Sequence, residues 1–277
     1  MSQLSILKAS LLGALQGATE FLPVSSSGHL VLAQHFLGVE LEGGQLLAFD
    51  VCLHFGTLLA VIFVFWRELA GMITAIFAPK MTTSVSAFSP KDSRRLFLFL
   101  VIATIPAGLI GVLFEDFFDG LFGNPLSASF MLIITGVILW FTKYIKGDGL
   151  GVERIGLTRS LIIGFSQALA IIPGISRSGS TISAAIYSGL NRDLAARFSF
   201  LLAVPAILGA SILKIGDLSE LSKDNLIAVV IGTAISCAVG VAAIKGLLAI
   251  IRRRSFHWFA VYCWVAGISS MIYLLLK

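Results

Sequence analysis

GALQGATEFLPVSSSGH, residues 13–29, returns 151 positions later as GFSQALAIIPGISRSGS, residues 164–180. The residues that recur at this constant offset are Gly13, Gln16, Ser25, Ser27 and Gly28, which correspond to Gly164, Gln167, Ser176, Ser178 and Gly179. The prolines Pro23 and Pro173 are out of register by one position. Because the matching residues are polar or break helices, chance similarity between glycine-rich apolar helices accounts for the match poorly. We interpret the two stretches as an internal repeat.

The chain around this repeat is strongly apolar. Of its 277 residues, 57% are hydrophobic and 13% are charged, against roughly 25% charged residues in a soluble domain, and its mean hydropathy is +0.96. This composition excludes a disordered chain, a nucleic-acid-binding arm and an ordinary cytosolic enzyme. We therefore expect an all-α polytopic membrane protein that forms a single integral membrane domain over residues 1–277 and binds no nucleic acid.

Six apolar runs are long enough to cross a bilayer as helices. They cover approximately Leu46–Trp66, Leu96–Phe114, Pro125–Phe141, Phe198–Leu213, Leu226–Ile251 and Trp258–Leu276. Basic residues gather at Arg67–Arg95, at Lys143–Arg159, at Arg192 and Arg197, and at Arg252–Arg254, and the positive-inside rule places these loops in the cytoplasm. Acidic residues gather at Glu40 and Glu42, at Glu115–Asp119, and at Asp217–Asp224, so we expect these loops outside.

Two stretches, residues 1–38 and 160–190, remain outside the six spans, and the charge pattern requires each to begin and end on one side of the membrane. We expect each to form a re-entrant helical hairpin, the first entering from outside and the second from the cytoplasm. Each hairpin precedes three transmembrane helices, so the halves, approximately 1–150 and 151–277, have opposite orientations and both termini lie outside. The sequence thus predicts an inverted-topology repeat.

Four further features of the sequence argue against disulfides, a cleaved signal peptide, ATP as a fuel and an anionic partner. Cys52, Cys237 and Cys263 are an odd number and each lies in an apolar segment, so we expect no disulfide framework. The first apolar run is not followed by a small-residue cleavage site, and we expect no cleaved signal peptide. The sequence contains no Walker-type loop, which argues against ATP as a fuel. The net charge of +5 reflects the basic loops rather than an anionic partner.

The repeated stretches carry the residues expected at a functional site. In each, a proline ends one half-helix and a serine-rich tract opens the next, Ser25–Gly28 in the first and Ser176–Thr181 in the second. Serine is a preferred N-cap, and a helix N-terminus offers free amides and the positive end of the helix dipole. Two such ends meeting in the membrane would form an anion site. We expect its substrate-binding residues to be Gln16, Ser25, Ser27, Gly174, Ser176, Ser178 and Thr181.

Charged and titratable residues accompany these tracts. Arg177 lies deep in an apolar segment and its planar guanidinium matches phosphate oxygens in two places, so we expect it to be the main phosphate ligand. The alternative is an interfacial arginine that marks topology. Glu20 and His29 flank the first break, and we expect them to act together, with a satisfied structural pair as the alternative. Asp50 and His54 line the mouth of the site or form a local helical pair.

Glu20 is also the expected metal position. Gln16 lies four residues earlier on the same helix face, where it could orient the carboxylate or contact the ligand. The sequence has no Cys–His cluster, so protein groups alone would hold a metal poorly. A divalent cation, magnesium or calcium, shared between Glu20 and substrate phosphates fits the habit of magnesium to bind one or two carboxylates plus phosphate oxygens.

QGATEFLPVSSSGH at 16–29 and PGISRSGST at 173–181 resemble the two signature motifs of the undecaprenyl pyrophosphate phosphatase family, the bacitracin-resistance proteins. Length and span pattern resemble that family over the whole chain. The resemblance implies a multi-pass enzyme of the bacterial inner membrane that removes the terminal phosphate of undecaprenyl pyrophosphate, a polyprenyl pyrophosphate lipid, and so recycles the carrier lipid for cell-wall synthesis. It also implies a divalent cation and a site open to the periplasm.

The resemblance assigns individual residues of this chain to positions in the two family motifs. Those on the first motif are Glu20, Ser25, Ser26 and His29, and those on the second are Ser176, Arg177 and Thr181. Gln16 stands at the first position of the family's E-or-Q-x-x-x-E pattern, which leaves Glu20 as the essential carboxylate and argues against a mechanism that needs two carboxylates.

We therefore expect a phosphatase in which Arg177, the serine-rich helix ends and a divalent cation hold the pyrophosphate. His29 is the expected nucleophile or acid–base group, Ser26 is the competing nucleophile, and direct attack by water is the third route. The rival from another class is a polyprenyl-phosphate flippase or other anion transporter, which needs Arg177 and the helix ends but no nucleophile. We expect the polyprenyl tail in the lipid between spans, and leave a homodimer open.

Overall fold

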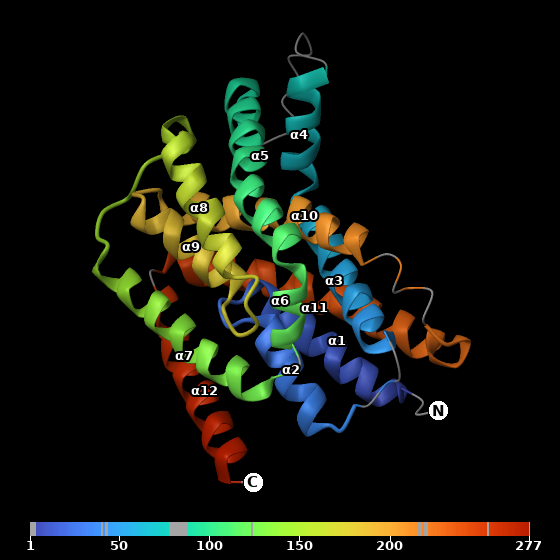
Figure 1. Ribbon diagram of the computed structural model, residues 1–277. Helices are drawn as coiled ribbons and strands as arrows, with labels where there is room; N and C mark the ends of the chain where they lie inside the picture. The colour runs from blue at the N-terminus through green and yellow to red at the C-terminus, as the bar shows by residue number, and fades with distance from the viewer. Residues whose placement is uncertain are drawn as a thin grey trace.

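The computed structural model describes residues 4–39, 41, 44–77, 88–122, 124–214, 216, 218, 221–253 and 255–276, and within them the chain is all-helical (Figure 1). The α-helices are α1 (Ile6–Phe21), α2 (Ser26–Phe36), α3 (Gln45–Val64), α4 (Trp66–Phe77), α5 (Pro90–Leu113), α6 (Glu115–Phe122), α7 (Pro125–Trp140), α8 (Leu157–Leu169), α9 (Arg177–Tyr187), α10 (Arg192–Leu213), α11 (Leu226–Arg252) and α12 (Phe259–Leu276). Short 3-10 helices are η1 (Phe141–Tyr144), η2 (Val152–Arg154), η4 (Lys223–Asn225) and η5 (Phe256–Trp258). Loop residues used for the topology prediction that fall outside the described residues are Glu40, Glu42, Lys80, Asp217, Glu220 and Arg254.

The six predicted membrane spans are confirmed. Among the described residues, the helices long and apolar enough to cross a membrane are Gln45–Val64, Pro90–Leu113, Pro125–Tyr144, Arg192–Leu213, Lys223–Arg252 and Phe256–Leu276. Two of them, Pro90–Leu113 and Arg192–Leu213, begin six residues earlier than predicted, because polar caps start the helix before the apolar run does. Ser89 caps α5 by accepting from the Asp92 amide, and Asn191 caps α10 by accepting from the Leu194 amide. The charged first turns are therefore helical rather than loop.

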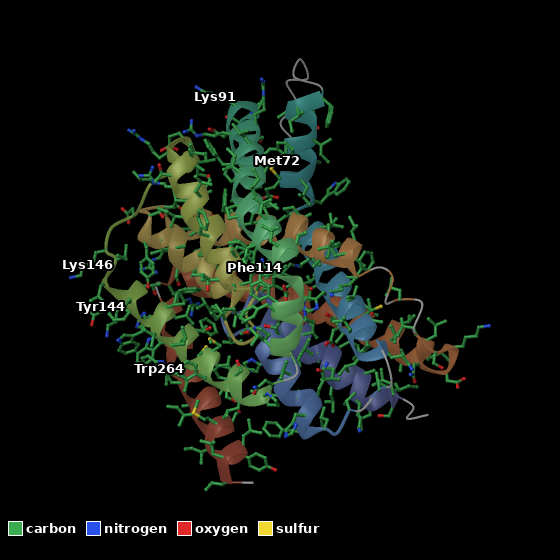
Figure 2. The ribbon with its side chains drawn as sticks, in the orientation of Figure 1. Met72, Lys91, Phe114, Tyr144, Lys146 and Trp264 are labelled. Carbon is green, nitrogen blue, oxygen red and sulfur yellow. The ribbon has the colours of Figure 1, made fainter. Side chains whose placement is uncertain are left out.

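Helix α4 occupies part of a predicted cytoplasmic loop. It follows α3 almost directly and packs against α5. The C-terminal end of α4 and the N-terminal ends of α5 and α8 all lie toward the top of Figure 1. Lys91, near the start of α5, lies at the same end (Figure 2). The start of α1 and the end of α12 lie toward the opposite end of the molecule (Figure 1). Which side of the membrane each terminus occupies stays a prediction.

Two pairs of helices are too short to cross a bilayer. Helices α1 and α2 have 16 and 11 residues, and α8 and α9 have 13 and 11, against about 20 for a transmembrane helix. The members of each pair pack against each other, and the breaks between them are the predicted proline–serine tracts. These are the segments predicted as re-entrant hairpins. Their re-entrant course and the inverted relation of the two halves stay predictions.

Each short pair packs against a span from the other half of the chain. Helix α1 lies along α11 and α8 lies along α5. Small residues permit the first contact: a Cβ on Gly13 would lie 2.2 Å from the Gly232 carbonyl oxygen, and one on Gly17 would lie 2.4 Å from that of Ser236. Any side chain at either position would push α1 away from α11. Glycine therefore fixes how closely the first pair is held.

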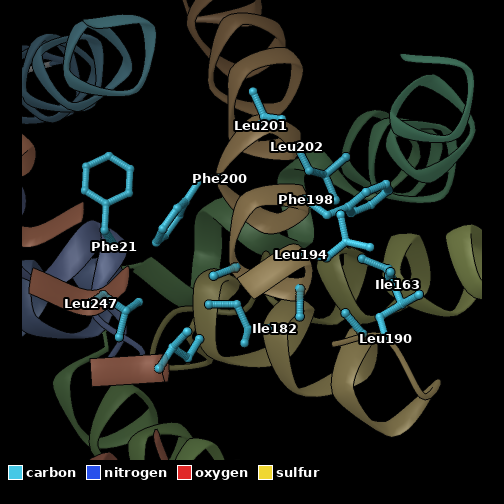
Figure 3. Packing of buried hydrophobic residues seen from close by; sticks show 14 of the residues in the cluster. Phe21, Ile163, Ile182, Leu190, Leu194, Phe198, Phe200, Leu201, Leu202 and Leu247 are labelled. Atoms are coloured by element: carbon cyan, nitrogen blue, oxygen red, sulfur yellow. The ribbon is translucent and has the colours of Figure 1, made fainter. Parts of the chain in front are cut away.

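An apolar core packs against the end of α1 and against α9. Phe21, at the end of α1, meets Phe200 of α10 edge to face with ring centroids 5.6 Å apart, and both side chains are fully buried (Figure 3). Ile182 of α9 and Leu247 of α11 belong to the same cluster. This packing fixes α1, α9 and α10 relative to one another. The residues that follow Phe21 therefore have a rigid support.

Candidate functional site

The breaks of the two short pairs touch each other. A Cβ on Gly28 would lie 2.9 Å from the Cα of Gly174, and the Ser178 hydroxyl donates to the Leu22 carbonyl over 3.0 Å. Gly174 has a φ of +96°, which favours glycine, and its carbonyl accepts from the buried Thr135 hydroxyl of α7. Two segments 151 positions apart in the sequence thus meet at one place.

Both breaks end in a serine N-cap. The Ser25 hydroxyl accepts from the Gly28 amide over 3.3 Å, and the Ser176 hydroxyl accepts from the Gly179 amide over 3.0 Å. A second serine hydroxyl lies two residues on in each case, Ser27 at 3.3 Å and Ser178 at 3.2 Å from the capping oxygen. The N-termini of α2 and α9 therefore adjoin, with amides and hydroxyls suited to an anion.

Glu20 stands at the centre of this arrangement. Its carboxylate is buried and accepts from the Gln16 amide at 2.9 Å, from the Ser26 hydroxyl at 2.5 Å and from the Arg177 guanidinium at 3.0 Å. The carboxylate thus joins α1, the first residue of α2 and the first residue of α9. Ser26 and Arg177 are both less buried than Glu20, so they lie on its accessible side.

Arg177 reaches across to α10 as well. Its second terminal nitrogen donates to the Ser199 carbonyl at 3.3 Å, and the Ser199 hydroxyl lies 2.6 Å from that of Thr181. The guanidinium therefore spans Glu20 and α10 rather than facing an aqueous interface. This position agrees with a ligand-binding arginine better than with an arginine that only marks topology.

His54 belongs to the same cluster and was not predicted as a central residue. Its Nε2 lies 3.7 Å from Glu20 Oε2, while its Nδ1 donates to the backbone carbonyl of Asp50 over 2.8 Å. The Asp50 carboxylate instead accepts from Gln34 of α2 at 2.7 Å. The spacing of Asp50 and His54 was the available signal, but a helical pair four residues apart has the same spacing. Helix α3 therefore joins α1, α2, α9 and α10 at the site through His54.

His29 does not meet Glu20. Its Nδ1 donates to the Ser25 carbonyl at 2.8 Å and its Nε2 lies 2.8 Å from the Tyr262 hydroxyl. The described contacts of the Glu20 carboxylate are with Gln16, Ser26, His54 and Arg177, and His29 is not among them. The predicted pairing of the carboxylate and the imidazole is therefore not made. Tyr262 lies on α12, far along the chain, and no local sequence pattern pointed to it.

The structure describes all three cysteines, whereas the predicted divalent cation stays a prediction. Cys52, Cys237 and Cys263 are all free, as predicted. Within the described residues there is no group of three or more His, Cys, Asp or Glu side chains that could hold a metal. Glu20 offers one carboxylate, surrounded by donors. A cation bound there would take most of its ligands from phosphate oxygens and water, which fits the habit of magnesium.

Comparison with known proteins covers nearly the whole chain. A family model described as bacitracin resistance protein BacA matches residues 9–269. The undecaprenyl-diphosphatase of Desulfatibacillum aliphaticivorans is 44% identical over 272 residues, covering 96% of this chain and 98% of the relative. The proteins of the same name from Halothermothrix orenii and Methanobrevibacter smithii are 40% and 41% identical, covering 97% and 96% of this chain and 98% and 96% of theirs.

Proposed function

The chain belongs to the bacitracin resistance protein BacA family, and on that premise we propose that it is an undecaprenyl-diphosphatase, a membrane hydrolase that converts undecaprenyl pyrophosphate to undecaprenyl phosphate and inorganic phosphate. The observation that carries the proposal is the contact of 2.5 Å between the Ser26 hydroxyl and Glu20, beside Arg177 and two helix N-termini. A transporter needs the anion-binding groups of this set. It does not need a hydroxyl held against a carboxylate.

Ser26 is the proposed nucleophile. Its hydroxyl is partly exposed and its proton points at Glu20 Oε2, so the carboxylate can accept the proton as the oxygen attacks. His29 is a weaker candidate because both of its ring nitrogens are engaged by Ser25 and Tyr262 and the ring is buried. The geometry therefore favours the serine among the routes open from the sequence.

The reaction then has two steps. Ser26 Oγ bonds to the terminal phosphorus, its proton passes to Glu20, and the bond from that phosphorus to the bridging oxygen breaks, so the polyprenyl monophosphate leaves. Water next attacks the phosphorus and leaves both of its hydrogens on the phosphate, the bond to Ser26 breaks, and the serine regains a proton from Glu20 as inorganic phosphate leaves. No oxidant or nucleotide is consumed.

The second pair supplies binding rather than a nucleophile. Arg177 lies 3.0 Å from Glu20 Oε1 and is positioned to contact the oxygens of a phosphate held over Ser26. Its fork can bind two oxygens at once, and fixed donors stabilise the charge that builds on the transferred phosphoryl group. The amides at the starts of α2 and α9 add to the same field. Substrate binding therefore depends on both pairs, and covalent chemistry on the first.

A divalent cation completes the proposal. Glu20 would supply a carboxylate ligand, and the pyrophosphate and water would supply the rest. When bound, magnesium or calcium would neutralise charge on the leaving phosphate oxygens. The residues derived above keep their roles of holding the phosphate and moving the serine proton.

The membrane supplies the setting for the substrate. Six spanning helices place the protein in a membrane, and the lipid tail of the substrate needs no polar contacts, so we propose that it lies in the bilayer beside the spans. We propose the inner, cytoplasmic membrane, with the site open to the periplasm, because these are the setting and the orientation that the family resemblance implies.

The test is phosphate release by the purified protein in detergent with magnesium present. There is only one compartment in detergent, so a transporter yields no phosphate there. We expect release from undecaprenyl pyrophosphate by the wild type and its loss in Ser26→Ala. Release without any dependence on Ser26 would contradict the serine mechanism, and failure of the folded wild type to release phosphate would contradict the enzyme.

A further inference from the structure

The backbone at the first break is strained. Ser25 has a φ of +69° and a ψ of +97°, and among the described residues it is the only non-glycine with a positive φ. Such a conformation costs about 1–3 kcal/mol and persists where neighbouring groups hold it in place. Ser25 directly precedes Ser26, the proposed nucleophile. The strain therefore lies next to the group whose position matters most.

The contacts of His29 reach this strained residue. The imidazole Nδ1 donates to the Ser25 carbonyl over 2.8 Å, so in the neutral ring Nε2 is an acceptor. The Tyr262 hydroxyl lies 2.8 Å from Nε2 and can donate to it, and the two rings are nearly parallel, with centroids 5.6 Å apart and planes 11° apart. One hydrogen bond on each nitrogen fixes both the tautomer and the ring plane.

Helix α12 contacts the first break at a second residue. The Cys263 thiol, fully buried, lies 3.6 Å from the Pro23 carbonyl. Trp264, the next residue, donates to the Ile133 carbonyl of α7 over 3.2 Å and packs where a Cβ on Gly136 would be (Figure 2). Three consecutive residues of α12 thus tie the first break to α7. The contacts of Cys263 and Trp264 thus fix the turn of α12 that carries Tyr262.

We propose that Tyr262 is a positioning residue of the phosphatase reaction, which acts through His29 to hold Ser25 in its strained conformation and so aims Ser26 at the phosphorus. The inference rests on the proposed function for its catalytic consequence, and on the chain of contacts from α12 to Ser25 for its structural part. A serine presented on a strained turn at the start of a helix is also how α/β-hydrolases expose their nucleophile, which is an analogy of geometry alone.

The experiment compares Tyr262→Phe with Tyr273→Phe, a tyrosine of the same helix with similar exposure whose ring packs on Phe36. Tyr262→Phe keeps the aromatic ring and removes the hydroxyl. We expect kcat to fall about 10- to 100-fold with an almost unchanged KM and an unchanged melting temperature, because a small displacement of a nucleophile has effects of this size. Tyr273→Phe should keep wild-type kcat.

A double variant tests the route of the effect. If Tyr262 acts through His29, Tyr262→Phe adds almost nothing to the loss in His29→Ala. Additive losses would overturn the proposal, as would wild-type kcat in Tyr262→Phe. A raised KM at constant kcat would overturn it too, since that result assigns Tyr262 to substrate binding. A lowered melting temperature that accounts for the lost activity would overturn it by assigning Tyr262 a purely structural role.

A nitrogen spectrum separates this inference from the proposed function. In protein labelled with 15N-histidine, which has four histidines, the His29 signals are assigned by their loss in His29→Ala. We expect a single neutral tautomer with the proton on Nδ1, and a shift of the Nε2 signal in Tyr262→Phe but not in Tyr273→Phe. No shift would overturn the contact. If the wild type releases no phosphate, the proposed function is wrong, but this spectrum still tests whether Tyr262 contacts His29.

Discussion

The α1–α2 and α8–α9 pairs use the same backbone device for different chemistry. In both, a serine caps the second helix through the amide three residues on, with a second serine hydroxyl beside it. The first helical residue then differs: it is Ser26 in one pair and Arg177 in the other. A repeated frame thus offers two equivalent places, and the chain fills one with a serine hydroxyl, the proposed nucleophile, and the other with an arginine.

The two pairs differ further at positions that the repeat makes equivalent. Gln16 donates to Glu20, whereas both polar atoms of the buried Gln167 have no hydrogen-bond partner in the described part of the chain. At the offset of 151, Glu20 corresponds to Ile171 and His29 to Ser180. The first pair has a carboxylate and a braced imidazole where the second has neither. Similar folding therefore does not imply similar function, even within one chain.

The largest expected effect breaks the comparison at Ser26. Ser26→Ala should lower kcat by about 1,000-fold or more, since loss of a nucleophile removes the covalent route and leaves binding alone. Ser27→Ala, one residue on and also partly exposed, should cost less than about tenfold because its hydroxyl contacts Ser25 and not Glu20. Steady-state phosphate release measures both. Equal losses in the two variants would refute the special place of Ser26.

The equivalent position of the second pair should give a smaller loss. Arg177→Lys keeps the charge and removes the fork, and we expect kcat/KM to fall about 100-fold at normal membrane insertion. Arg159→Lys is the matched control, because Arg159 of α8 donates to the carbonyls of Arg154 and Ser188 away from the site. Near-wild-type kcat/KM in Arg177→Lys would move phosphate binding to other groups.

The glutamines sharpen the comparison. Gln16→Leu should lower kcat about tenfold, because it removes a donor to a buried carboxylate, and such hydrogen bonds contribute about 1.5–3 kcal/mol. Gln167→Leu should leave kcat unchanged and raise stability by about 1 kcal/mol, because it buries an apolar group in place of an unpartnered amide. Activity assays and thermal unfolding in detergent check the pair. A large loss of activity in Gln167→Leu would show that the second amide contacts substrate.

The smallest effect concerns the backbone of the two capping serines. Ser25→Gly should raise stability by about 0.5–1 kcal/mol, because glycine adopts a positive φ without strain and weakens the cap only slightly. Ser176 has a φ of −72°, so Ser176→Gly should instead lower stability by about 0.5–1 kcal/mol. Melting temperatures of the two variants decide the matter. Shifts of the same sign would mean that the Ser25 backbone carries no strain.

The spans could be predicted from sequence because a bilayer demands long apolar helices, and a run of about 20 such residues is rare in a chain that folds in water. Helix α4 escaped the prediction because Arg67 and Glu68 interrupt its apolar pattern at the point where α3 ends. Glu68 is buried against Arg197 of α10 over 2.7 Å, so its charge has a partner that no local pattern reveals. The ion pair with α10 therefore allows the charged start of α4 to be buried, which the sequence of α4 alone does not predict.

The site was predictable where a motif repeats and not where distant elements meet. Glu20 and Arg177 stood out as charges in apolar helices, and the structure joins them across 157 positions of sequence. His54 and Tyr262 come from helices with no motif of their own, and Tyr262 is 233 positions from His29. Packing alone brings such residues together. The predicted contact between Glu20 and His29 is not made, because the imidazole contacts Tyr262 of α12 instead, and no local pattern reveals that partner.

The central claim is that Ser26 carries the phosphoryl group and that the second pair only binds it. The most direct measurement is rapid quenching of wild-type enzyme with undecaprenyl pyrophosphate, in acid and separately in base, followed by peptide mass spectrometry. We predict one phosphoryl group on Ser26 that survives acid, because a phosphate ester of serine is stable there. A label on His29 that survives only base, or a label on any residue of α8 or α9, would contradict the account.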